Sequence, residues 1–279
     1  MSEASSVAAV QHPSTVETIS TGLRDLGLRG GQTVVVHASM RSMGWVCGGA
    51  DTVIQALTHE LGPQGTLVMP AHSAGLSEPS GWQRPPIPPD WWPLVRETMP
   101  AFDRQRTPTR CMGAIAELFR TLPGSLRSDH PTSSVAAAGP RAAEIVRLHS
   151  LEDPMGLASP WATLYELGAL VLLLGVGHER NTALHLAERK AFGAAQRRIE
   201  AGAPVSRAGR RHWVTYEEPD VSTDDFNRVG AVFEQQANAV RLARLGAAEA
   251  RLMPLRSLVD FAERWLLAHR TADGCPTER

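Results

Sequence analysis

Four polar residues that could carry chemistry follow an apolar run in the stretch VLLLGVGHERNTALHLAE, residues 171–188. If a helix starts near Asn181, then Asn181, His185 and Glu188 are spaced by four and three residues and share one face, with His178 in the turn before it. An imidazole suits proton transfer near neutral pH, and a neighbouring carboxylate can orient its ring. His185 is therefore a candidate general base or acid, and the alternative is a core histidine with satisfied hydrogen bonds.

The elements around this stretch place the candidate residues after a strand. Val171–Leu174 has the length and apolarity of a buried strand, and the Ala, Leu and Glu residues after Asn181 favour a helix. The sequence therefore predicts a strand, a tight glycine turn and a helix.

Three other chemistries fit this stretch less well. A dinucleotide fingerprint would need a third glycine where Arg180 stands, which would block close packing of helix and strand. A zinc site formed by His178, His185 and Glu188 would match no established short motif, so we expect no metal. A serine hydrolase of the Gly-x-Ser-x-Gly type is not indicated, because the pentapeptide does not occur.

A loop of small residues, ASMRSMGWVCGG (residues 38–49), lies between a predicted strand at Thr33–His37 and a predicted helix at Ala50–Leu61. Glycines allow close approach of a backbone, and a helix N-terminus favours anions. The loop could therefore lie against the phosphates or amides of a cofactor, or serve only as a connector.

An acidic cluster follows the predicted strand His212–Tyr216, and its members are Glu217, Glu218, Asp220, Asp224 and Asp225. Carboxylates pair strongly with ammonium groups and attract cationic substrates, whereas the alternative is a solvated turn before a helix N-terminus. Because side chains alternate along a strand, one of the two adjacent glutamates should face away from any ligand.

Composition limits the class of protein. The chain has 279 residues, 43% hydrophobic composition and a net charge of -1, which suits one large domain or a core with a smaller lobe. No apolar span of 18 residues and no secretory signal occur, so we expect a cytoplasmic protein with no membrane partner. Near-neutral charge without a long basic stripe disfavours nucleic acid as a partner. The sequence contains no CxxC pair, so a thiolate metal site is not indicated. A small-molecule partner is favoured.

Strands and helices alternate along the chain, which predicts an α/β fold. A flexible N-terminus is expected over residues 1–12, and a Pro/Trp-rich irregular insertion around residues 74–105. Helices are predicted at Val16–Leu26, Gly113–Leu122, Pro140–His149, Trp161–Leu167, from about Asp225 to Gln236, and at Pro254–His269. Further strands are predicted at Thr66–Pro70, Ser134–Ala138 and Asn238–Leu245, the last with Val240, Leu242 and Ala243 inward, and a cationic turn region at Arg197, Arg198, Arg207, Arg210 and Arg211.

Seven segments in register resemble the aminoglycoside 3-N-acetyltransferase family. They are HASMRSMGWVCGG, LVMPAHS, MPAFDRQRTPTRCMGAIAE, RSDHPTSSVAAAG, ASPWATLYELGA, LLLGVGHERNTALHLAE and RHWVTYEEP. The resemblance implies an antibiotic N-acetyltransferase fold, an α/β fold of the α+β type with a mixed sheet flanked by helices, distinct from the common acetyltransferase superfamily. It also implies one catalytic domain over residues 13–272, with an acidic substrate-binding lobe around residues 195–236, as a monomer or homodimer.

The resemblance further implies acetyl transfer from acetyl-coenzyme A to the 3-amino group of the 2-deoxystreptamine ring of aminoglycoside antibiotics, which confers resistance. His185 would be the base for direct attack in a ternary complex, Glu188 its orienting carboxylate, and Asp224 or Asp225 an acid near the amine or the histidine. The residues implied for the coenzyme are His37, Ser39, Met40, Arg41, Ser42, Val46, Gly48, Thr107 and Gly113, and those for the antibiotic are His72, Asn181, Glu217, Glu218 and Asp225. Alternatives are acetylation of another amine and a non-catalytic protein that binds coenzyme A or a cation.

Overall fold

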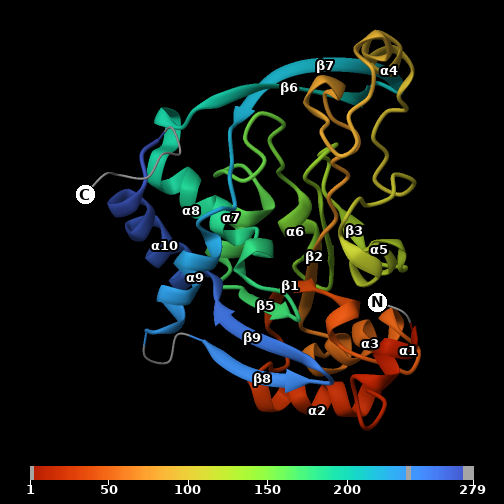
Figure 1. The fold of residues 1–279 in the computed structure, drawn as a ribbon, viewed down its shortest axis with the longest axis vertical. Coiled ribbons are helices and arrows are strands. Elements are labelled where there is room, and N and C mark those ends of the chain that lie inside the picture. Colours follow the sequence, from red (N-terminus) through yellow and green to blue (C-terminus); the bar gives the residue numbers. More distant parts are fainter. Residues whose placement is uncertain (1–2, 237–239, 273–279) are drawn as a thin grey trace.

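The computed structural model describes residues 3–236 and 240–272, and its centre is a seven-stranded sheet of order β3-β4-β2-β1-β5-β9-β8 (Figure 1). The strands are β1 (Thr33–Ala38), β2 (Thr66–Pro70), β3 (Leu126–Arg127), β4 (Val135–Ala138), β5 (Leu170–Leu174), β8 (Arg241–Leu245) and β9 (Ala248–Pro254). β1 runs parallel to β2 and β5, whereas β4 and β9 pair antiparallel to their neighbours. The predicted mixed sheet is confirmed.

Helices cover both faces of this sheet, because alternate side chains of each central strand point to opposite sides. Val34 and Leu172 belong to the apolar cluster shared with α2 (Val16–Leu26), α3 (Ala50–Leu61) and α5 (Gly113–Thr121). Val35 and Val171 belong to the opposite cluster, which includes residues of α6 (Ala142–Val146), α7 (Pro160–Glu166), α8 (Ala183–Phe192), α9 (Phe226–Glu234) and α10 (Leu255–His269). The buried strands therefore present their carboxyl ends between two helical layers.

The segment expected to be a cationic turn is instead mostly a hairpin of β6 (Arg198–Arg207) and β7 (Arg210–Pro219), so that prediction was wrong. Ala208 and Gly209 both have positive φ at the tip, as a two-residue hairpin turn with the favoured twist requires. The buried hydrophobic cluster of this hairpin is small, consisting of Ala201, Ala203 and Tyr216, and most of the charged residues of the hairpin are exposed. The apolar pattern was too weak to indicate two long strands.

The Pro/Trp-rich insertion packs against this hairpin, as Figure 1 shows for α4 (Trp92–Thr98). The Phe102 amide donates to the Pro204 carbonyl oxygen at 3.0 Å, and Arg211 Nε donates to the Met99 carbonyl oxygen at 2.7 Å. The segment is also less irregular than expected, because short helical turns at Pro79–Gly81 and Pro89–Trp91 precede α4. Insertion and hairpin together form a lobe at one end of the sheet.

Three further predictions need correction. Helix α6 is shorter than Pro140–His149, because the His149 ring binds the Ser128 hydroxyl and the Pro154 carbonyl oxygen outside the helix. The late strand starts at Arg241 in the described part of the chain, and Asn238 lies outside the described residues. Leu242 points outward, being 60% exposed on the edge strand β8, whereas Leu245 is buried. Strand β9 was not predicted at all.

At the N-terminus, residues 3–8 form the short helix α1 (Glu3–Ala8), which has no buried residue. The flexibility expected for residues 1–12 stays a prediction, and residues 1–2 lie outside the described part. Within residues 3–236 and 240–272, no helix has the length and apolarity needed to cross a membrane.

Candidate active site

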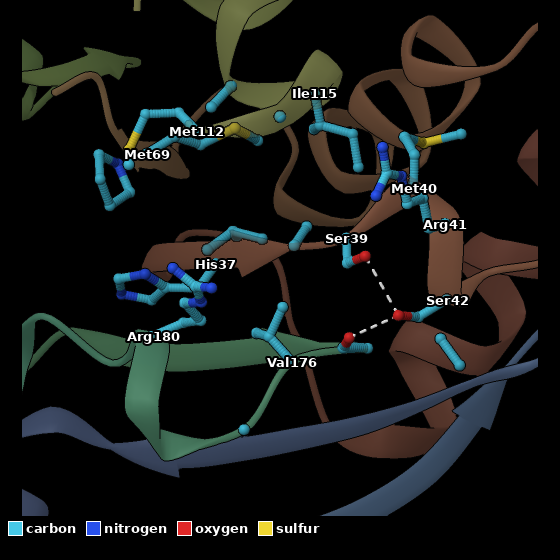
Figure 2. Close-up of a pocket in the computed structure, with 18 of the residues that line it drawn as sticks. His37, Ser39, Met40, Arg41, Ser42, Met69, Met112, Ile115, Val176 and Arg180 are labelled. Atoms are coloured by element: carbon cyan, nitrogen blue, oxygen red, sulfur yellow. Dashed lines mark hydrogen bonds between the residues drawn. The ribbon is translucent and has the colours of Figure 1, made fainter. Parts of the chain in front are cut away.

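A cavity of about 1040 Å³ opens at the carboxyl ends of the parallel strands, where ligands commonly bind in open α/β sheets (Figure 2). Its wall includes residues 36–42 at the end of β1 and just after it, 111–116 at the start of α5, 175–177 after β5, and 247–249 at the start of β9. Segments far apart in the sequence therefore converge here because their strands are neighbours in the sheet.

Gly175 lets two of these segments approach each other. The Ser42 hydroxyl donates to the Gly175 carbonyl oxygen at 2.7 Å, and its oxygen lies 3.1 Å from that of Ser39 (dashed lines in Figure 2). A Cβ atom on Gly175 would lie 2.4 Å from Ser42 Cβ, and the residue has a φ of +67°. The first glycine of Gly-Val-Gly therefore fixes the loop after β1 against the end of β5.

The cavity brings together most of the residues predicted to hold the coenzyme. His37, Ser39, Met40, Arg41, Ser42 and Gly113 line it. Val46, Gly48 and Thr107 do not: Val46 is buried in the apolar cluster, Gly48 lies against Thr52, and the Thr107 hydroxyl accepts the Asp103 amide. Their predicted role stays untested.

The sequence reading missed a second exposed cation in this cavity. Arg180 lines the wall, and Figure 2 draws it and Arg41 toward opposite ends of the view. Arg180 stands where a dinucleotide motif would have its third glycine. The presence of an arginine at this position could have indicated a cation at the mouth of the turn after β5.

His185 is held in a buried dyad with Glu188. The His185 Nδ1 atom lies 2.5 Å from Glu188 Oε2, with the histidine side chain 10% exposed and the glutamate fully buried. The His185 ring packs on Phe226 at the start of α9, with 4.7 Å between ring centroids. A carboxylate at Nδ1 fixes the ring and leaves Nε2 as the nitrogen that could exchange a proton with substrate.

Asn181 belongs to a different network. It has a non-helical ψ of 87°, and α8 begins only at Ala183, so the expected common face of Asn181, His185 and Glu188 was wrong. The Asn181 Nδ2 atom lies 3.3 Å from His178 Nδ1, and His178 Nε2 lies 3.0 Å from Glu234 Oε1. These residues join the turn after β5 to α9.

Two further histidines stand at the ends of the parallel strands. The Nε2 atoms of His37, in β1, and His72, just after β2, are buried without a hydrogen-bond partner among the described residues. Burial lowers the pKa of each to about 3. Repulsion from a neighbouring imidazole contributes less: His72 acts on His37, and His185 acts on His72. Both rings are therefore neutral at physiological pH, and His72 lies within electrostatic reach of His185.

These buried histidines predict acid-sensitive folding. Burial lowers the pKa of His37 and His72 to about 3 and that of His130 to about 4, whereas a histidine in the unfolded chain titrates near ~6.5. Below that pH the unfolded chain binds protons that the folded chain does not. The free energy of unfolding is thus independent of these three groups above about pH 7. It falls at lower pH, by about 4 kcal/mol per pH unit near pH 5 for the three together.

Thermal melts between pH 8 and pH 5 test this expectation. The midpoint should fall steeply below pH 6.5, and a His130→Asn variant should have a shallower slope because it removes one of the protons. A midpoint independent of pH between 7.5 and 5.5 would contradict neutral burial of these rings.

The acidic cluster divides between the hairpin and the start of α9. The Glu217 side chain is 75% exposed, whereas Glu218 is half-buried, as strand alternation predicted. Burial raises the pKa of the Glu218 carboxyl, an effect that nearby Arg198 partly offsets. Asp220 is ion-paired with Arg197, which reduces its availability to a cationic ligand.

Asp224 and Asp225 come directly before Phe226, whose ring contacts that of His185. Asp224 is exposed and Asp225 is half-buried. The described residues contain no group of three or more histidine, cysteine, aspartate or glutamate side chains placed to hold a metal ion.

Comparisons with known proteins cover nearly the whole chain. Residues 35–267 match the family model described as aminoglycoside 3-N-acetyltransferase. The chain is 42% identical to the SPbeta prophage-derived aminoglycoside N(3')-acetyltransferase-like protein YokD of Bacillus subtilis (strain 168), over 94% of this chain and 95% of that protein. The crystal structure of YokD has a TM-score of 0.92 and covers 95% of this chain and 97% of its own.

Two ligand-bound structures are also similar. The structure "AAC-IIIb binary with CoASH" has a TM-score of 0.82 at 30% identity, covering 96% of this chain and 100% of that one. The structure "AAC-VIa bound to Sisomicin" has a TM-score of 0.83 at 31% identity, covering 92% of this chain and 98% of that one.

Proposed function

Because the chain belongs to the aminoglycoside 3-N-acetyltransferase family, we propose that it transfers acetyl from acetyl-coenzyme A to the 3-amino group of the 2-deoxystreptamine ring of aminoglycoside antibiotics. The predicted family is confirmed, and with it the class of enzyme, an acyltransferase. Acetylation converts a cationic ammonium group into a neutral amide, and an aminoglycoside modified in this way would no longer make its charged contacts.

The observation that carries the proposal is a large cavity at the carboxyl ends of the parallel strands together with a buried His–Glu dyad on α8. The two are linked by Thr182, which lines the cavity and whose carbonyl oxygen accepts the His185 amide at 3.1 Å. Met40, Met69 and Met112 give the cavity apolar walls suited to a pantetheine arm, while Arg41 and Arg180 provide exposed cations suited to phosphates. The similar structure that contains CoASH supports coenzyme A as the donor.

Carboxylates suited to a cationic acceptor come directly before α9, the helix that contacts the dyad. We assign Asp224 and Asp225 to the region of the attacking amine because they precede the helix whose Phe226 packs on His185. Glu218, and less directly the exposed Glu217, would bind further ammonium groups from the hairpin. The similar structure bound to sisomicin supports an acceptor of this kind.

The dyad would act as a general base in a ternary complex. His185 Nε2 accepts a proton from the 3-amino group as its nitrogen attacks the thioester carbonyl carbon, and Glu188 orients the ring through Nδ1. The new C–N bond forms and the C–S bond breaks. His185 then returns the proton to the departing thiolate, so that no acyl-enzyme is required.

A thiol-release assay with acetyl-coenzyme A and a panel of amines tests this function. We expect turnover with aminoglycosides that contain 2-deoxystreptamine and none with simple polyamines of equal charge. Turnover with other amines only would show that the proposed acceptor is wrong. Tight binding of acetyl-coenzyme A without turnover of any amine would overturn the proposed activity in favour of a binding protein.

A further inference from the structure

The buried carboxylate of Glu188 has a second partner, Arg270. Glu188 Oε2 faces His185 Nδ1 at 2.5 Å, while Glu188 Oε1 lies 2.7 Å from Arg270 Nη1. The Glu188 side chain is 0% exposed and that of Arg270 is 4% exposed. One carboxylate thus joins an imidazole and a guanidinium, both shielded from solvent.

Arg270 reaches this place from the far end of the chain. It directly follows α10, the helix that packs against α8, and its amide donates to the Leu266 carbonyl oxygen at 2.9 Å. Its guanidinium also lies 6.0 Å from the centroid of the Phe192 ring at the end of α8. The backbone of Arg270 is therefore fixed relative to α8, and its buried guanidinium is held beside Glu188 by the ion pair, because its Nε and Nη1 atoms have no hydrogen-bond partner among the described residues.

The ion pair between Glu188 and Arg270 affects the charge that the dyad can carry. An uncompensated charge is costly in a buried site, and two strongly interacting groups titrate as a pair. The dyad alone is neutral when it holds one proton and carries a negative charge when it holds none. A fixed guanidinium compensates that negative charge, which favours the state with an unprotonated imidazole.

We propose that Arg270 is a positioning residue that holds Glu188 as a carboxylate and thereby keeps His185 free of its proton near neutral pH. This inference rests on the proposed role of His185 as the base. Arg270 would touch neither substrate, and its effect would pass entirely through Glu188.

The other groups around the dyad do not supply this charge. His72, from the loop after β2, is neutral because burial lowers its pKa to about 3, and α9 presents the apolar Phe226 ring. On α8, Lys190 is engaged with Asp260 and Glu263 at 2.8 and 2.9 Å. Arg189, its neighbour, is bound to Asp153 at 2.8 Å.

The test compares Arg270→Met with Arg270→Lys in the full-length chain. Since an opposite charge at this range shifts a titration by about 1–3 pH units, the acid limb of kcat/KM should move to higher pH by about one unit or more in Arg270→Met. Its kcat/KM at pH 7 should fall, by up to tenfold for each pH unit of the shift, and recover toward pH 9. Arg270→Lys, which restores the charge, should return the limb toward the wild-type position.

A uniform loss of activity at every pH in Arg270→Met would overturn the proposal, because a purely structural defect does not move a titration. If Arg270→Met does not fold, the comparison uses Glu188→Gln with and without Arg270→Met. The double variant should have the pH profile of Glu188→Gln alone, and a further shift in it would contradict action through Glu188.

The outcome is separable from that of the proposed function. A His185→Ala variant that keeps full activity would overturn the proposed role of His185 as the base, and with it the proposed function of the dyad. An inactive His185→Ala variant, together with an unshifted profile in Arg270→Met, would overturn only the role of Arg270.

Discussion

Replacing His185 with alanine is expected to lower kcat by about 10²-fold or more, the usual contribution of a general base. Glu188 fixes the His185 ring at Nδ1, at 2.5 Å, and Phe226 packs against the face of the ring. A water molecule in the variant would lack these contacts and would not take over the role of an oriented base. Affinity for acetyl-coenzyme A should change little, because His185 does not line the cavity assigned to the donor. Steady-state kinetics and calorimetry of coenzyme binding measure the two effects.

His59→Ala provides the matched control, since His59 is an exposed histidine of α3 whose side chain is 67% exposed. That variant should keep wild-type kinetics. An His185→Ala variant with the activity of His59→Ala would make His185 a core histidine, the alternative that its sequence left open.

Replacing Gly230, in α9, with alanine is expected to destabilise the fold strongly. A Cβ atom at this position would lie 2.1 Å from two ring carbons of His178, and that ring is bound by Glu234 and Asn181. Since overpacking of a core costs about 3 kcal/mol at the upper end of its usual range, where the neighbour cannot move, the melting midpoint should fall by about 6 °C.

Gly81→Ala is the control for this substitution, because a Cβ atom there meets open space and the φ angle is not positive. Its melting midpoint should equal or exceed that of the wild type. Equal midpoints for the two variants in the same thermal scan would contradict the close packing of α9 on the turn after β5.

Local patterns predicted the elements that position the site. The apolar run Val171–Leu174 is a buried strand, and α2 and α3 have the predicted bounds because apolar periodicity and nearby turns are encoded within each segment. Alternation along a strand likewise predicted that only one of Glu217 and Glu218 would face inward. Such signals depend on residues a few positions apart.

Signals that depend on distant residues were missed. The contact between Glu188 and Arg270 joins positions 82 residues apart, and nothing in the sequence near Arg270 indicates that its side chain is buried. The start of α8 was placed two residues early, which wrongly put Asn181 on the face of His185. The strand predicted at His212–Tyr216 is confirmed within β7, but β6 and the hairpin were missed because most of their charged side chains are exposed and no apolar alternation marks two long strands.

The position of the transferred acetyl group tests the central claim most directly. The full-length chain is incubated with acetyl-coenzyme A and an aminoglycoside that contains 2-deoxystreptamine, and the product is analysed by mass spectrometry and NMR. We predict a single added acetyl group on the 3-amino nitrogen, formed with one equivalent of free thiol. An acetyl group on any other nitrogen, or thiol release without an acetylated antibiotic, would contradict it.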